Sequence, residues 1–219
     1  MICLVTDRRR VSSGHDAADR LVELVAAAAH AGVDLIQVRE RDLEARDLIA
    51  LVRRCLDAVR GTTTNVLVND RTDVALAAAA HGVHLRGDSI EATVARALLP
   101  PGALVGRSVH TVEEAAAASR AGGLDYLILG TLFPTSSKDS THRLTTLDEL
   151  SAASRASSVP VLAIGGMTVE RASAAARAGA SGVAGVGLFV PPGGRPWHPH
   201  LQAIVADLRR AFDTCGAVP

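Results

Sequence analysis

The stretch from Val159 to Gly187 reads VPVLAIGGMTVERASAAARAGASGVAGVG and contains one complete strand–helix–strand pattern. The apolar run 159–165 predicts a strand, and the Ala- and Arg-rich segment 169–178 has helical periodicity. A second apolar run at 182–186 predicts the next strand. Gly179 follows the helical segment, where a C-terminal cap is expected. Two strands joined by a helix form the repeating unit of α/β folds.

The same unit can be followed along the whole chain. The predicted strands are residues 2–6, 34–39, 65–69, 82–85, 103–106, 125–130, 159–165 and 182–186. The helical segments that follow them are residues 17–31, 43–60, 72–80, 90–99, 111–121, 146–155, 169–178 and 199–212. Glycines stand where helix caps are expected, at Gly32, Gly61, Gly82 and Gly179, with Gly122 and Gly123 in the corresponding place.

Eight parallel strands with right-handed crossovers close most naturally into a (β/α)8 TIM barrel. We therefore predict an α/β protein with a single barrel domain spanning residues 1–219. An open, doubly wound sheet is the alternative, but no Gly-x-Gly-x-x-Gly fingerprint follows an early strand.

The composition disfavours nucleic-acid-binding and membrane proteins. The chain has 219 residues, with 23 Lys plus Arg against 23 Asp plus Glu, so no charge excess favours nucleic acid or an anionic membrane. No apolar run reaches the roughly 20 residues that a membrane span needs, and the start lacks a signal-peptide pattern. We predict a cytoplasmic protein with small-molecule substrates, and the sequence leaves the oligomeric state open, a homo-oligomer included. Cys3, Cys55 and Cys215 are too widely spaced to indicate a disulfide framework or a zinc site.

Lysine usage singles out one position. Of the 23 cationic residues, Lys138 is the only lysine, and it follows Thr135, Ser136 and Ser137 in the long segment 130–144. A compact ammonium fits between phosphate oxygens differently from a planar guanidinium, and together with hydroxyls it is typical of an oxyanion or phosphate site. The alternatives are a solvated Ser/Thr loop, which leaves the length of the segment unexplained, and a surface lysine retained by chance.

In such a barrel the reactive groups follow the carboxyl ends of the strands. Gln37 and Arg39 alternate in direction with their neighbours, so both are expected to point into the barrel mouth. An inward arginine needs an anion; alternatively, Arg39 pairs with Glu40 or Asp42 at the rim. The preceding run Arg8-Arg9-Arg10 is most simply interpreted as a solvated loop.

Further polar residues follow the third to sixth predicted strands. Asn69 and Asp70 either cap the next helix or bind a ligand, and Asp70 suits Mg²⁺, which often takes one or two carboxylates plus phosphate oxygens. Ser108 follows the fifth predicted strand. Three histidines near these positions are interpreted as structural rather than catalytic, namely His84, His110 and His142.

Glycines after the last two strands indicate a second anion site. Gly165 and Gly166 follow the seventh strand, and Gly185-Val186-Gly187 ends the eighth. A phosphate bound to a TIM barrel is typically held there by backbone N–H groups. Two facing anion sites suggest two phosphorylated substrates.

Seven short strings, distributed over nearly the whole chain, resemble the thiamin phosphate synthase family and its sister group, the thiazole tautomerases. The strings are Leu4-Val5-Thr6-Asp7, Gln37-Val38-Arg39-Glu40-Arg41, Val68-Asn69-Asp70-Arg71, Gly82-Val83-His84-Leu85, Gly106-Arg107-Ser108-Val109-His110, Phe133-Pro134-Thr135-Ser136-Ser137-Lys138 and Ala163-Ile164-Gly165-Gly166-Met167. Their shared order and spacing make the resemblance specific.

The resemblance implies that 4-amino-5-hydroxymethyl-2-methylpyrimidine pyrophosphate condenses with thiazole phosphate, after the pyrophosphate has left. It implies Mg²⁺ as cofactor on Asp70, with Asp88 as a second ligand, and catalytic roles for Arg39, Ser108 and Lys138. The implied substrate-binding residues are Gln37, Arg39, Arg41, Asn69, Ser108, Thr135, Ser137, Lys138, Gly165, Gly166, Val186 and Gly187.

The chain departs from the family pattern at three places. Arg41 stands where the family has lysine, and Ser89 stands where the synthases have the aspartate that serves as second metal ligand. For that reason Asp88, one residue earlier, is the substitute ligand. Thr131 stands where the tautomerases have their catalytic histidine.

Two alternatives to the synthase therefore stay open. One is a thiazole tautomerase, and the other is a non-catalytic barrel that binds a thiamin precursor. Retention of Asn69, Asp70 and Lys138 favours the enzyme over the non-catalytic barrel.

Overall fold

The computed structural model describes residues 1–135, 143–191 and 197–213. Eight parallel strands pair in chain order and close into a barrel through the pairing of β1 with β8. The strands are β1 (Ile2–Val5), β2 (Leu35–Val38), β3 (Asn65–Asn69), β4 (Gly82–Leu85), β5 (Leu104–Val109), β6 (Tyr126–Leu129), β7 (Val161–Ile164) and β8 (Gly182–Gly185). The predicted TIM barrel is confirmed.

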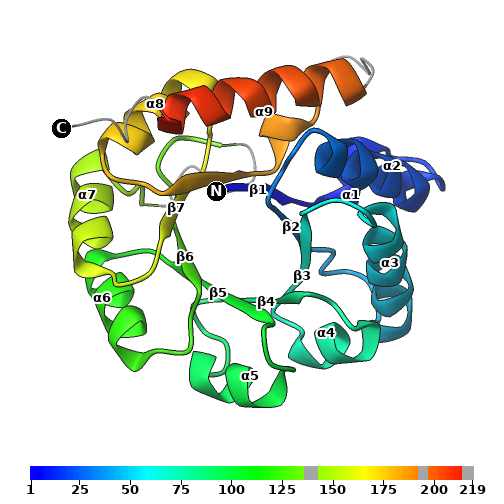
Figure 1. Cartoon of the computed structure of the whole chain (residues 1–219), viewed down its shortest axis with the longest axis horizontal. Coiled ribbons are helices and arrows are strands. Elements are labelled where there is room, and N and C mark those ends of the chain that lie inside the picture. Colours follow the sequence, from blue (N-terminus) through cyan, green and yellow to red (C-terminus); the bar gives the residue numbers. More distant parts are fainter. Residues whose placement is uncertain (136–142, 192–196, 214–219) are drawn as a thin grey trace.

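Helices form a ring outside the strands (Figure 1). They are α2 (Ala17–His30), α3 (Ala45–Ala58), α4 (Thr72–Ala78), α5 (Ala92–Leu98), α6 (Val112–Ala121), α7 (Leu147–Ala156), α8 (Val169–Arg177) and α9 (Trp197–Asp213). Each corresponds to a predicted helical segment, with ends that differ by a few residues. Two short helices were not predicted, α1 (Arg8–Val11) and the 3-10 helix η1 (Gly187–Phe189).

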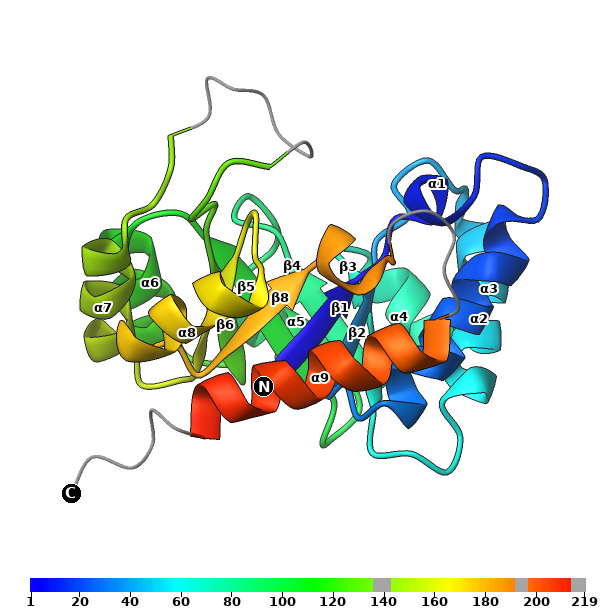
Figure 2. The ribbon, with the colours of Figure 1, turned by 90° about the horizontal axis from the view of Figure 1, so that it is seen from above.

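The interpretation of the Arg8-Arg9-Arg10 run as a solvated loop is wrong. The run forms α1, which Asp7 caps by accepting a hydrogen bond from the backbone of Arg9. Arg8 lies against the β2–α3 connection, where its guanidinium is 3.0 Å from Glu40 and 2.5 Å from Asp42. Two carboxylates after the neighbouring strand therefore hold this helix in place. Figure 2 shows α1 at the edge of the barrel.

Strand alternation divides the apolar residues into two sets. Alternate strand residues such as Cys3, Leu67 and Leu162 pack inside the barrel, and their neighbours pack against the helices. Tyr126 occupies the space above Gly106, where an added Cβ would lie 2.2 Å from the tyrosine Cζ. The barrel is thus filled by side chains below its carboxyl end.

The strand β5 continues to Val109, three residues beyond its predicted end at residue 106. Ser108 pairs in register with Ile128 of β6. Ser108 therefore belongs to the strand and not to the loop after it, and its side chain points to the barrel interior.

The predicted glycine caps are confirmed at Gly32, Gly61 and Gly179, whose φ angles are 90°, 79° and 93°. The prediction for Gly82 is wrong. The left-handed cap of α4 is Ala79, with φ of 56°, and Gly82 begins β4. Glycine is required there because an added Cβ would lie 2.0 Å from the backbone oxygen of Leu104.

Within the described ranges, no helix is long and apolar enough to cross a membrane. Cys3 and Cys55 are buried free thiols, and burial raises the pKa of each to about 12. Cys215 lies outside the described residues.

Candidate active site

A cavity of about 1130 Å³ opens at the carboxyl end of the barrel. Residues from the ends of all eight strands line it, so the cavity lies on the barrel axis. The predicted site residues that line it are Gln37, Arg39, Arg41, Asn69, Asp88, Ser108, Thr135, Gly165, Gly166, Val186 and Gly187. Asp70 is not among the lining residues, although the preceding residue, Asn69, is one. Ser137 and Lys138 lie outside the described residues.

Arg39 lines the cavity, and no carboxylate of the described residues forms an ion pair with it. Glu40 and Asp42, the two carboxylates proposed as alternative partners, are both bound by Arg8. No hydrogen bond or ion pair of the Arg39 guanidinium occurs among the described residues. Burial and the neighbouring charge of Arg41 lower the pKa of Arg39, so both effects disfavour its charged form. An anion bound in the cavity would relieve both effects.

A buried network fixes the backbone that carries Arg39. The Thr6 hydroxyl donates to Glu40 at 2.7 Å and accepts from the backbone N–H of Arg39 at 2.9 Å. The Glu40 carboxylate also accepts from the backbone and guanidinium of Arg8. The buried Glu40 therefore fixes the backbone of Arg39 through Thr6, while its carboxylate bonds to Arg8 and not to the Arg39 guanidinium.

The cavity is enriched in positive charge. Among the described lining residues there are five arginines and three carboxylates. The arginines are Arg10, Arg39, Arg41, Arg86 and Arg107, and the carboxylates are Asp88, Glu91 and Glu114. A concave site with this balance attracts anionic substrates.

Asn69 ends β3, Asp70 follows it, and neither residue caps α4. Arg71 is the N-cap residue of α4, and the cap has no side-chain hydrogen bond. Asp70 has a left-handed backbone with φ of 63°, and its Oδ1 is buried with no hydrogen-bond partner among the described residues. The capping alternative is therefore not supported, and Asp70 keeps one carboxylate oxygen available for a ligand.

Arg86 lies between the two predicted metal ligands. Its guanidinium is 3.5 Å from Asp70 Oδ2 and 2.5 Å from Asp88 Oδ2. The Asp88 side chain is 71% exposed, whereas that of Asp70 is 27% exposed. Within the described ranges, no group of three or more His, Cys, Asp or Glu side chains could hold a metal ion. Of the two predicted ligands, only Asp70 has a buried carboxylate oxygen without a hydrogen-bond partner among the described residues.

The glycine pair after β7 makes a sharp turn at the cavity wall. Gly165 and Gly166 have φ angles of 107° and 56°. An added Cβ on Gly166 would lie 2.4 Å from the carbonyl oxygen of Pro134, and one on Gly165 would lie 2.4 Å from Thr131 Cγ2. Only glycine fits this turn, which brings backbone into direct contact with the cavity.

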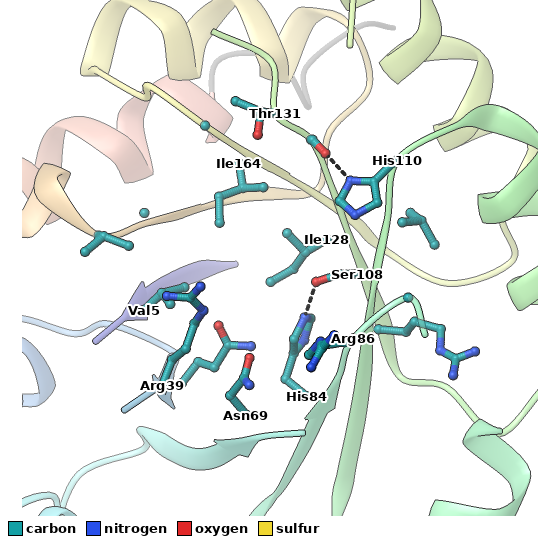
Figure 3. A pocket seen from close by; sticks show the side chains of 18 of the residues that line it. Val5, Arg39, Asn69, His84, Arg86, Ser108, His110, Ile128, Thr131 and Ile164 are labelled. Carbon is teal, nitrogen blue, oxygen red and sulfur yellow. Dashed lines mark hydrogen bonds between the residues drawn. The ribbon is translucent and has the colours of Figure 1, made fainter. Parts of the chain in front are cut away.

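Two hydrogen bonds link His84 of β4 to side chains of the neighbouring strands β5 and β6, and the bond to Ser108 is drawn in Figure 3. His84 Nε2 is 2.8 Å from Ser108 Oγ, and His84 Nδ1 is 3.1 Å from the Tyr126 hydroxyl. Burial lowers the pKa of His84 to about 3 and raises that of Tyr126 well above its usual value. Both rings are therefore neutral at physiological pH. The sequence interpretation of His84 as structural missed this link to Ser108, although its inward position in β4 is a usable signal.

We expect the stability of the fold to depend on pH through His84. Its pKa is about 6.5 when exposed and about 3 in the folded protein, so the unfolded chain takes up the proton first. The stabilisation is complete above pH 6.5 and is lost as the pH falls toward 3, at about 1.4 kcal/mol per pH unit. Urea unfolding between pH 6 and 4.5 should show a steeper loss for the wild type than for His84→Gln. His30→Gln, which removes an exposed histidine, should behave like the wild type. Equal slopes for all three proteins would contradict this assignment.

Thr131, at the position of the tautomerase histidine, lines the cavity and is buried. A threonine hydroxyl does not titrate near neutral pH, so it supplies neither a general acid nor a general base. His110 also lines the cavity, and its Nδ1 is 2.6 Å from the carbonyl oxygen of Gly130.

A TIM barrel with an arginine-rich mouth and a glycine turn at one wall is typical of enzymes that act on phosphorylated substrates. The model of the family described as thiamine monophosphate synthase matches residues 2–189. A thiamine-phosphate synthase from Roseiflexus castenholzii is 41% identical over 184 residues, which cover 84% of this chain and 78% of that protein.

A second synthase, from Haloarcula marismortui, is 41% identical over 165 residues, covering 74% of this chain and 78% of that protein. A solved structure of a thiamine phosphate pyrophosphorylase from Pyrococcus furiosus superposes with a TM-score of 0.79 at 28% identity, covering 98% of this chain and 96% of that chain. The chain belongs to the thiamine monophosphate synthase family.

Proposed function

We propose that this chain is a thiamin phosphate synthase, which joins 4-amino-5-hydroxymethyl-2-methylpyrimidine pyrophosphate to thiazole phosphate and releases pyrophosphate. The observation that carries this proposal is the partly buried Arg39, which faces the cavity while its neighbouring carboxylates bind Arg8. Such a cation suits a di-anionic or tri-anionic leaving group. Formation of thiamin phosphate and pyrophosphate in equal amounts from the two substrates is the experiment that tests it.

The leaving pyrophosphate is assigned to the arginine-rich side of the cavity. Arg39 and Arg41 extend from the end of β2, and the Lys138 ammonium is assigned to the same group on the basis of its hydroxyl-rich sequence. Fixed positive charges stabilise the negative charge that develops as the carbon–oxygen bond breaks. No protein nucleophile is needed, because the thiazole nitrogen captures the pyrimidinyl methyl cation.

Asp70 is the proposed Mg²⁺ ligand, supported by its buried and unpartnered Oδ1. A bound Mg²⁺ would neutralise charge on the pyrophosphate oxygens. Asp88 stays the proposed second ligand, and to serve as one it must leave its contact with Arg86.

The thiazole phosphate is assigned to the part of the cavity wall that follows β7 and β8. Gly165 and Gly166 supply exposed backbone there, and Val186 and Gly187 line the same cavity at the start of η1. Gln37, Asn69 and Ser108 line the same cavity and are assigned to the aminopyrimidine. This arrangement orients the two reacting groups toward each other. A cytoplasmic location is proposed on the basis of this biosynthetic role.

A further inference from the structure

His84, Tyr126 and Ser108 form two hydrogen bonds in the barrel interior, and the number of hydrogens that these three side chains can donate is fixed. Neutral His84 carries one N–H, and Tyr126 and Ser108 carry one O–H each. The bonds at His84 Nδ1 and Nε2 each require one hydrogen, so one hydrogen is left over. The hydroxyl that carries this remaining hydrogen, either that of Tyr126 or that of Ser108, must donate it to another acceptor.

The hydrogens can be arranged in two ways. In only one of them does every buried hydrogen have an acceptor. If Ser108 donated to Nε2, then Nδ1–H would donate to the Tyr126 oxygen, and the phenolic hydrogen would need another acceptor. Tyr126 is 1% exposed, and among the described residues its hydroxyl has His84 as its hydrogen-bond partner and no other. A buried donor without an acceptor is strongly disfavoured.

The opposite arrangement satisfies every group. The Tyr126 hydroxyl donates to Nδ1, Nε2–H donates to Ser108 Oγ, and the Ser108 hydrogen points away from His84. Ser108 is partly exposed and lines the cavity, so its hydrogen is available to a bound molecule or to water. The tautomer with hydrogen on Nε2 thus makes Ser108 a donor to the cavity.

The surroundings of Ser108 select the part of a substrate that it meets. Val5, Ile128 and Ile164 add apolar surface to the cavity that Ser108 lines, and Ile128 lies beside Ser108 (Figure 3). Flat heteroaromatic rings suit such a site, because they offer apolar faces and ring-nitrogen lone pairs at the edge.

We propose that Tyr126 and His84 are positioning residues, which orient the Ser108 hydroxyl as a donor to a ring nitrogen of the pyrimidine substrate. The identity of the ring rests on the proposed function, whereas the direction of the hydrogen bonds does not. The exocyclic amino group, itself a donor, is then left to the amide oxygens of Gln37 or Asn69.

The first test reads the tautomer in the ligand-free protein. Long-range ¹H–¹⁵N correlation spectra, assigned with His84→Gln, should show hydrogen on Nε2 and a bare Nδ1. Hydrogen on Nδ1 would overturn the proposal. This measurement does not depend on whether the chain is a synthase.

The second test is a double-mutant cycle on binding of pyrimidine pyrophosphate, measured by titration calorimetry without thiazole phosphate. Tyr126→Phe keeps the ring that packs on Gly106 and removes the first donor, and we expect it to weaken binding about tenfold. In a Ser108→Ala background the same change should have no further effect. Equal weakening in both backgrounds would show that Tyr126 acts by packing, which contradicts the proposal.

A matched control removes an equally buried hydroxyl at another place. Thr64→Val deletes a hydroxyl that donates to the carbonyl oxygen of Val33 at 2.6 Å, away from the cavity. It should leave the affinity for pyrimidine pyrophosphate unchanged. If the wild type binds no pyrimidine pyrophosphate, the proposed function fails. The measured tautomer of His84 still shows in which direction the two hydrogen bonds run.

Discussion

Asp70→Ala should lower kcat/KM on the order of 10³-fold while the protein stays folded. Its Oδ1 is buried and has no hydrogen-bond partner among the described residues, and its Oδ2 has only a 3.5 Å contact with Arg86. Removing the carboxylate therefore breaks little within the protein and removes the proposed Mg²⁺ ligand. Steady-state kinetics across a Mg²⁺ titration measure the effect.

The left-handed backbone of Asp70, with φ of 63°, calls for a second variant. Asp70→Asn keeps the shape and tolerates this conformation, but it loses the charge, so it should be nearly as inactive as Asp70→Ala. Asp73→Asn, on the neighbouring helix and paired with Arg71, is the matched control and should retain activity. Asp88→Ala should raise the Mg²⁺ concentration needed for half-maximal activity. Full wild-type activity in excess chelator would contradict the metal assignment.

Lys138→Arg should lower kcat/KM on the order of 10²-fold, although it keeps the positive charge. The reason is chemical shape, since a planar guanidinium does not reproduce the contact of a compact ammonium among hydroxyls. Lys138 is the only lysine in a chain that otherwise uses arginine, and it follows three consecutive hydroxyl residues. Steady-state kinetics with pyrimidine pyrophosphate as the varied substrate measure this loss.

The control is a change from arginine to lysine at an exposed position. Arg143 lies shortly after Lys138 in the sequence and forms an exposed ion pair with Glu149. Arg143→Lys should leave kcat/KM within a factor of about two, because exposed pairs contribute little. If Lys138→Arg is as active as Arg143→Lys, the single lysine has no special role.

The fold could be predicted because it depends on local periodicity. Every strand of the barrel overlaps a predicted apolar run, and Gly32 and Gly179 mark helix ends as expected. The error at Gly82 has a non-local cause, namely the close approach of the Leu104 backbone on the next strand. Sequence periodicity does not report such contacts between strands.

The candidate site could be predicted in part for the same reason. Strand ends meet at one end of a parallel barrel, so Gln37, Asn69 and Ser108 were expected to converge, and all three line the cavity. The partners of charged side chains could not be predicted. Arg8 binds Glu40 and Asp42, and thereby leaves Arg39 to the cavity, because α1 folds across the end of β2.

The role of His84 could be inferred only from the structure together with a count of the hydrogens in its two hydrogen bonds. Its two neighbours, Ser108 and Tyr126, are 24 and 42 residues away in the sequence. Only the register of β4, β5 and β6 brings the three side chains together. No local sequence signal encodes that register.

The most direct test of the account uses two reaction mixtures with the wild-type protein. The first contains pyrimidine pyrophosphate, thiazole phosphate and Mg²⁺, and the second contains the carboxythiazole phosphate isomer in deuterated water. We expect thiamin phosphate and pyrophosphate in equal amounts in the first mixture and no isomerisation in the second, because Thr131 provides no acid or base. Isomerisation with ring deuteration in the second mixture, with no pyrophosphate released in the first, would contradict the synthase and indicate a tautomerase.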